Sequence, residues 1–152
     1  MAILLCGGMI SCATSLRNET LIVPGNGVGP YDLGVTTREE VLADGHSLEE
    51  KDPQKLRFEF QFDEEDRLEY ISVHAPGWET ASGIGVGSSL GDMLQAYPVD
   101  GLIAQVHRDA HVGYIYWYPG ILFGLKQELG QLAVHDIFIM RFPPEESQPR
   151  GR

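Results

Sequence analysis

The sequence predicts an α+β fold, with a mainly antiparallel sheet and two short helices, arranged as two tandem strand-helix-hairpin units. Residues 37–42 (TREEVL) are echoed by residues 89–94 (SLGDML), and each copy follows a glycine-rich approach. Residues 56–62 alternate apolar and polar side chains, which is the period of a strand with one buried face. Strand-like segments also follow the second copy, so the same order of elements recurs along the chain.

The length and composition predict one domain, preceded by a signal-like segment and followed by a disordered tail. The chain has 152 residues, of which 43% are hydrophobic, and this is enough for one sizeable core. We expect a signal-like segment with a tether over residues 1–20 and a single domain over 21–142, whose halves span about 21–76 and 77–142. Residues 143–152 are polar and proline-rich, which predicts a disordered tail.

The charge argues against nucleic acid as a partner. The 22 acidic residues outnumber the 11 basic ones and leave a formal net charge of −11, which repels phosphate backbones and acidic lipid headgroups. The basic residues are scattered singly rather than clustered. We therefore expect a protein or glycan partner and no direct binding to nucleic acid.

The N-terminal residues predict export. Residues 1–10 are apolar apart from Gly7 and Gly8, and a stretch of this length is too short to cross a bilayer, which takes roughly 20 residues. Residues 9–12 (MISC) resemble a bacterial lipobox. The resemblance implies that Cys12 is lipidated and begins a mature envelope lipoprotein that touches the membrane only through its lipid. The alternative is a cytoplasmic protein in which residues 2–10 form a buried first strand or an unprocessed apolar tail and Cys12 is an ordinary small residue.

The first half begins with a short strand over residues 21–23 and a wide turn over 24–30. A helix then opens at a capping box, formed by Thr36 with Glu39 or by Thr37 with Glu40. Gly45 can end this helix in a left-handed conformation.

The clearest hairpin joins residues 56–62 to residues 68–73 around an acidic turn over 63–66. Phe58, Phe60 and Phe62 share one face of it, and we expect a helix to cover that face. The turn lacks the ligand spacing and the glycine of a calcium loop, so we interpret it as a solvated turn.

The second half repeats the cap with Ser89 and Asp92 and ends its helix before Pro98. Two hairpins are expected after it. Their strands span residues 102–107, 112–118, 121–125 and 132–139.

The two helix starts share a pattern: glycine, then serine or threonine, then a carboxylate three residues later, before Val41-Leu42 or Met93-Leu94. Followed by antiparallel strands, this pattern resembles small bacterial envelope domains of the beta-lactamase-inhibitor-protein-like class over residues 28–139. The resemblance implies a sheet with short helices and a binding role without chemistry.

Few residues are candidates for chemistry. His107, Asp109 and His111 flank one hairpin end and offer three weak metal donors, although we interpret them as ordinary turn and edge residues and expect no metal or cofactor. The serines near the glycines lack the strand-elbow-helix signature of a hydrolase.

The densest aromatic run spans residues 114–118. On a strand, Tyr114, Tyr116 and Tyr118 share one side while Trp117 lies on the other, so one side packs in the core. The other side is either shielded or exposed, and exposed tyrosine and tryptophan suit recognition of a partner. We take Tyr114, Tyr116, Trp117 and Tyr118 as the predicted partner-binding residues.

Together these observations predict a non-enzymatic envelope lipoprotein, or exported binding domain, that recognises a macromolecule through this aromatic surface. One alternative is a small enzyme or ligand carrier with a cleft between the halves, using the cluster around His107. The other is an intracellular structural domain.

Overall fold

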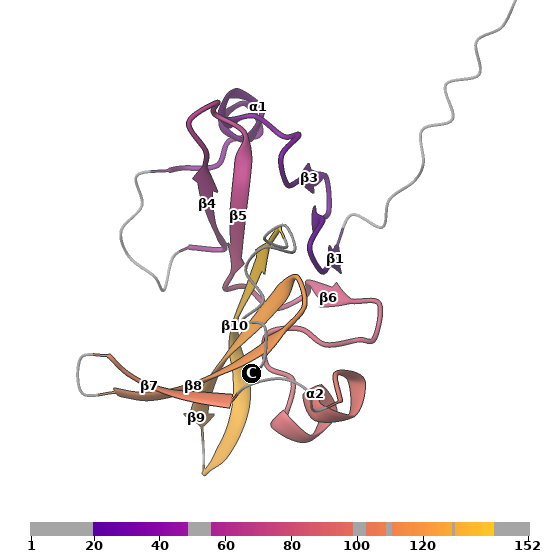
Figure 1. Cartoon of the computed structure of the whole chain (residues 1–152), viewed down its shortest axis with the longest axis vertical. Helices are drawn as coiled ribbons and strands as arrows, with labels where there is room; N and C mark the ends of the chain where they lie inside the picture. The colour runs from indigo at the N-terminus through magenta and orange to yellow at the C-terminus, as the bar shows by residue number, and fades with distance from the viewer. Residues whose placement is uncertain (1–19, 49–55, 99–102, 109–110, 129, 142–152) are drawn as a thin grey trace, which may run out of the picture.

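The computed structural model describes residues 20–48, 56–98, 103–108, 111–128 and 130–141. The described residues form an α+β fold with two antiparallel-rich sheets and two short helices, which confirms the predicted fold class (Figure 1). The elements are β1 (Leu21–Val23), β2 (Gly27–Val28), β3 (Tyr31–Asp32), α1 (Arg38–Ala43), β4 (Phe58–Phe62), β5 (Leu68–Val73), β6 (Glu79–Thr80), α2 (Leu90–Ala96), β7 (Ile103–Arg108), β8 (His111–Tyr118), β9 (Ile121–Glu128) and β10 (Gln131–Met140).

The large sheet has the order β4-β5-β10-β9-β8-β7, and all its pairs are antiparallel. The small sheet has the order β3-β2-β1-β6, and its β1–β6 pair is parallel. Because β1 opens the first half and β6 opens the second, this pair ties the halves together. The wide turn expected over residues 24–30 is in fact partly sheet, since β2 lies within it and pairs with β1.

Both helices begin at the predicted caps. The Thr37 hydroxyl accepts a hydrogen bond from the Glu40 N–H, and the Glu40 carboxylate accepts one from the Thr37 N–H at 2.7 Å, so the capping box is complete. The Ser89 hydroxyl accepts from the Asp92 N–H in the same way. Gly45 follows α1 at φ 84°, as predicted for a left-handed helix stop.

Each half anchors its helix start on the second strand of a hairpin. Gly34 N–H donates to Leu68 O at 2.6 Å and Leu68 N–H donates to Thr36 O at 2.8 Å. In the second half, Gly87 N–H donates to Val134 O at 2.8 Å and Val134 N–H donates to Ser88 O at 2.8 Å. These matching bonds identify β5 and β10 as equivalent strands, and the two pair with each other at the centre of the large sheet.

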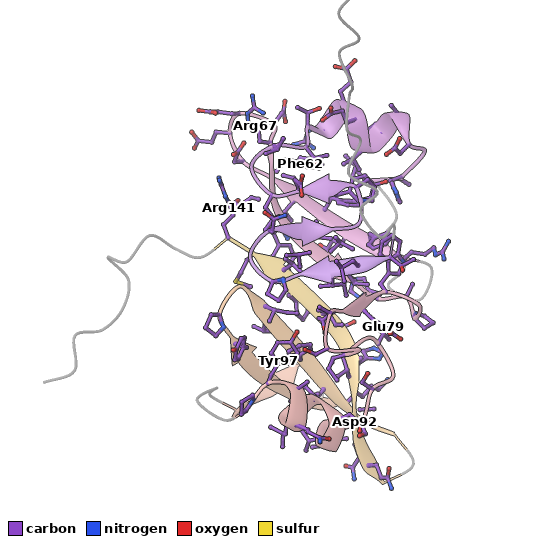
Figure 2. The ribbon with its side chains drawn as sticks, turned by 90° about the vertical axis from the view of Figure 1, so that its right-hand side faces the viewer. Phe62, Arg67, Glu79, Asp92, Tyr97 and Arg141 are labelled. Atoms are coloured by element: carbon purple, nitrogen blue, oxygen red, sulfur yellow. The ribbon has the colours of Figure 1, made fainter. Side chains whose placement is uncertain are left out.

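One continuous core lies between the sheets. In Figure 1, α2 and the small sheet lie on the same side of the large sheet, and α1 lies at the end of β4 and β5. Val41 of α1 and Met93 of α2 are fully buried in this core. Figure 2 shows Phe62 and Arg67 at the α1 end of the molecule and Asp92 and Tyr97 at the opposite end, by α2.

The cover of Phe58 and Phe60 differs from the expectation of a helix. Their rings contact Tyr31 of β3 and His46, which follows α1, and Trp78 packs on Phe58 with ring centroids 4.8 Å apart. A six-residue helix is too short to cover a two-stranded ribbon, so loop and small-sheet aromatics take that place. Phe62, at the end of β4 and opposite Leu68, is only half-buried.

A register shift in β10 changes which side chains of that strand face away from the core. Val134 lies opposite Leu125 and Asp136 lies opposite Gly124, so His135 is an extra residue that bulges out of β10. The bulge lets Val134, Ile137 and Ile139 all face the core although their spacing is not regular. It also turns Asp136 to the opposite face.

Candidate functional site

The candidate site lies on the face of the large sheet that points away from the core, which we call the outer face. Residues directly opposite in neighbouring strands share a face, so the register defines it from the buried core positions. The outer face combines half-buried apolar side chains with polar and charged ones. Its described residues include Glu59, Gln61, Tyr70, Ser72, Leu122, Gly124, Lys126, Ala133, Asp136, Phe138 and Met140.

A hydrogen-bond network connects β5 and β10 on this face. His74 directly follows β5, and its Nδ1 lies 2.7 Å from Asp136 Oδ1 of β10. Its Nε2 lies 3.0 Å from the Ser72 hydroxyl. Because a carboxylate only accepts, Nδ1 carries the proton, and in the neutral ring Nε2 accepts from Ser72. The His74 side chain is only 16% exposed, so the network is largely shielded from water.

Two further groups complete the network. Glu59 Oε2 of β4 lies 4.0 Å from His74 Nε2, and the Glu59 side chain is 49% exposed. Burial raises the pKa of the Tyr70 hydroxyl, and the charges of Glu59 and Asp136 raise it further, while hydrogen bonding with Ser72 opposes them. The Tyr70 ring also stacks on Phe138 with centroids 5.8 Å apart. Carboxylates, an imidazole and an aromatic pair thus meet on one half-buried surface.

The serine, histidine and aspartate have the connectivity of a hydrolase triad, but the Ser72 hydroxyl is not placed to attack a substrate. Ser72 is 0% exposed. It also lies within β5, between Glu59 and Phe138 of the neighbouring strands. The backbone N–H groups there form the hydrogen bonds of the sheet, so they are not available to stabilise an oxyanion. What this arrangement can do is hold β4, β5 and β10 together and present carboxylates beside aromatic rings.

A second polar cluster lies under the small sheet. The Tyr31 hydroxyl donates to Asp44 Oδ2 at 3.1 Å and lies 2.8 Å from His46 Nε2. Since the hydroxyl proton goes to the carboxylate, the imidazole Nε2 donates to the hydroxyl oxygen. Burial, with the hydrogen bond to Asp44 and its charge, raises the pKa of Tyr31 to about 12. This cluster fixes the loop after α1 against the aromatic core.

The predicted partner-binding residues lie along β8. By register, Tyr114, Tyr116 and Tyr118 are opposite Leu125, Phe123 and Ile121, which are core residues. Trp117 is opposite Leu122 of the outer face. Tyr118 is half-buried and packs edge-on against Tyr97, with centroids 4.9 Å apart. The side chains of Tyr114, Tyr116 and Trp117 lie outside the described part of the structure.

The remaining predicted sites are not brought together within the described residues. His107 and His111 occupy the facing ends of β7 and β8, opposite Val112 and Arg108, while Cys12 and Asp109 lie outside the described part. Among side chains that the structure describes, no three of His, Cys, Asp or Glu gather in a way that could hold a metal ion. Neither described helix has the length and apolar character needed to cross a membrane.

Reasoning from the sequence did not find the network around His74. One signal was present, because Ser72 and His74 are two residues apart at the end of a predicted strand and therefore share a face. Asp136 gave no such signal. If β10 alternated regularly, Asp136 would face the core together with Val134, two residues earlier. Only the bulge at His135 brings Asp136 to the outer face.

The fold and site together define a two-part α+β domain with a polar network between its halves. No protein-family model matches the chain, and no curated protein matches it. A solved structure, that of a DUF4309 family protein (YjgB) from Bacillus subtilis, is similar at 15% identity, covering 77% of this chain and 88% of that one with a TM-score of 0.47.

Proposed function

We propose that this protein is a non-enzymatic binding domain of the bacterial envelope, which recognises a basic protein partner through the outer face of its large sheet. The observation that carries the proposal is the make-up of that face. Half-buried apolar residues such as Leu122, Phe138 and Met140 lie beside the carboxylates Glu59 and Asp136. Apolar area with acidic groups suits a partner that presents lysine or arginine among apolar side chains.

The charge of the whole chain supports the same class of partner. A formal net charge of −11 steers cationic surfaces toward the protein and repels acidic ones. By register, one of the four predicted aromatic positions, Trp117, is a neighbour of Leu122 on the outer face, while the three tyrosine positions are opposite core residues. A glycan partner would bind to the same aromatic positions without depending on the carboxylates.

Binding of two matched peptides tests the proposal. One alternates arginine with leucine, and the control alternates glutamate with leucine. We expect the arginine peptide to shift backbone amide NMR signals of β5, β9 and β10 at residues 70–74, 122–126 and 136–140, and the glutamate peptide to leave them unchanged. Binding of neither peptide, or shifts confined to the small sheet, would contradict the proposal.

The envelope location rests on the resemblance of residues 9–12 to a lipobox. A lipid on Cys12 would attach the domain to a membrane, and an anchor with more than one acyl chain is stable. Intact mass of the protein extracted with detergent from its native cell tests this. A chain that begins at a diacylated Cys12 supports the location, and an unmodified chain that retains residues 1–11 overturns it.

A further inference from the structure

The groups around His74 suggest how the proposed binding face selects its partner. Glu59 approaches from β4, Tyr70 and Ser72 from β5, and Asp136 from β10. Lys126 of β9 lies on the same face, and Arg57 precedes Glu59 by two residues, just ahead of β4. Within the described residues, however, only His74 comes within 4.0 Å of either carboxylate as a group that can carry positive charge. The charge of this part of the outer face therefore changes with the protonation of one imidazole.

We propose that Glu59 and Asp136 receive a lysine or arginine side chain of the partner, and that the charge of His74 decides whether they can. This inference rests on the proposed function. When the ring is neutral, neither carboxylate has a cation within ion-pair distance among the described residues. When it is protonated, the imidazolium lies 2.7 Å from Asp136 Oδ1 and 4.0 Å from Glu59 Oε2, where it neutralises the carboxylates and repels a second cation.

The surroundings of the carboxylates suit a long cationic side chain. The Tyr70 and Phe138 rings lie on the same face and can pack against its methylene groups or its charge. Gly124 lies opposite Asp136 in β9, and a Cβ at that position would stand 3.4 Å from Asp136 Oδ2. The Phe138 ring lies nearer still, with Cε2 3.3 Å from that position, so the ring and the carboxylate stand side by side over the glycine.

Peptide affinity at two pH values tests the inference. The probe is the arginine–leucine peptide, and its control carries citrulline, which is neutral and of nearly the same shape, in place of arginine. For the unsubstituted protein we expect affinity for the arginine peptide to fall about tenfold from about pH 8 to about pH 5.5. His74→Gln should abolish this fall, Glu59→Gln should weaken binding at pH 8, and His135→Gln at the exposed bulge should change neither.

The outcomes separate the two proposals. If the arginine and citrulline peptides bind equally, or if His74→Gln keeps the full pH response, the outer face still binds the peptide but the gating role of His74 is overturned. If no peptide binds at either pH, the proposed function itself fails. Because His74→Gln can disturb folding, the imidazole signals of the unsubstituted protein give a second measurement. Bound arginine peptide must lower the pH at which His74 is half protonated, and an unchanged midpoint overturns the inference.

Discussion

The two halves of the molecule hold a helix start to a strand in the same way, but with different side chains. In each half, a turn glycine and a capped helix are held to the second strand of a hairpin, at Leu68 in the first half and at Val134 in the second. Both anchor residues are buried, and so are the helix residues Val41 and Met93 that follow the caps. The repeated geometry therefore depends on backbone bonds and a few apolar positions, while most other residues are free to differ.

The caps show how one methylene group changes a motif. In α1 the Glu40 carboxylate reaches the Thr37 backbone N–H at 2.7 Å as well as the Thr37 hydroxyl at 2.9 Å. In α2 the shorter Asp92 side chain accepts from the Ser89 hydroxyl at 2.6 Å, and the described structure shows no bond from the Ser89 N–H to it. The second helix start is thus held by fewer bonds, although its sequence pattern is nearly the same.

The halves meet at a seam between β5 and β10, where Ile71 pairs with Ile139 and Val73 with Ile137. All four side chains are fully buried. Such a seam is expected to make the halves unfold as one unit, because neither half can bury these residues alone.

The largest expected effect is at this seam. Ile71→Ala in the first half and Ile139→Ala in the second should each lower the free energy of unfolding by about 2–5 kcal/mol, since each removes a fully buried side chain and leaves a cavity. Urea unfolding followed by circular dichroism and by tryptophan fluorescence checks this. Coincident transitions are expected for both variants. Two separate transitions, each moved by only one substitution, would show that the halves are independent domains.

A smaller effect is expected where His74 of the first half bonds Asp136 of the second. His74→Ala should cost about 1–3 kcal/mol, because the buried Ser72 hydroxyl and the Asp136 carboxylate lose their shared partner. His135→Ala at the exposed bulge should change stability by less than about 0.5 kcal/mol. Equal losses in the two variants would mean that the network does not link the halves.

Alkaline pH should destabilise both halves through buried tyrosines. The pKa of Tyr31 in the first half is raised to about 12, and burial also raises that of Tyr97 in the second half. Tyrosine in an unfolded chain ionises near pH 10, so their contribution is complete below about pH 10 and is lost as the pH rises toward 12. Melting temperature should fall over this range, and less steeply in Tyr31→Phe. An identical slope in that variant would exclude Tyr31 as a source.

The smallest expected effect comes from exchanging the carboxylate residues of the two helix caps. Asp92→Glu should complete the second capping box and raise the melting temperature by about 1 °C, and Glu40→Asp should shorten the first one and lower it by a similar amount. Scanning calorimetry at neutral pH and low salt can resolve such shifts. A fall in both variants would show that the difference between the caps is set by the backbone around them.

Local patterns in the sequence predicted much of this fold. The alternation over residues 58–62 predicted the buried faces of Phe58 and Phe60, and the cap spacing predicted where both helices start. These features depend on residues close together in the chain, whose geometry follows from the helix and strand periods. The partner-binding role of β8, the lipid on Cys12 and the weak metal donors near His107 stay predictions.

The candidate site could not be derived in this way. Ser72 and His74 share a strand end, but Asp136 lies 62 residues from His74, and it joins them only because the bulge at His135 shifts the phase of β10. The small sheet was missed for a similar reason, since two-residue strands such as β2 and β3 have no period to detect.

By itself, then, the sequence of this protein determined its acidic character, its two capped helix starts and the strands with a clear apolar period, because each of these is a property of composition or of neighbouring residues. The tertiary structure alone decided that β5 and β10 pair as equivalents, that loop and small-sheet aromatics rather than a helix cover Phe58 and Phe60, and that Glu59, Ser72, His74 and Asp136 meet. These features depend on strand register between distant segments, and a shift of one residue moves every side chain to the opposite face.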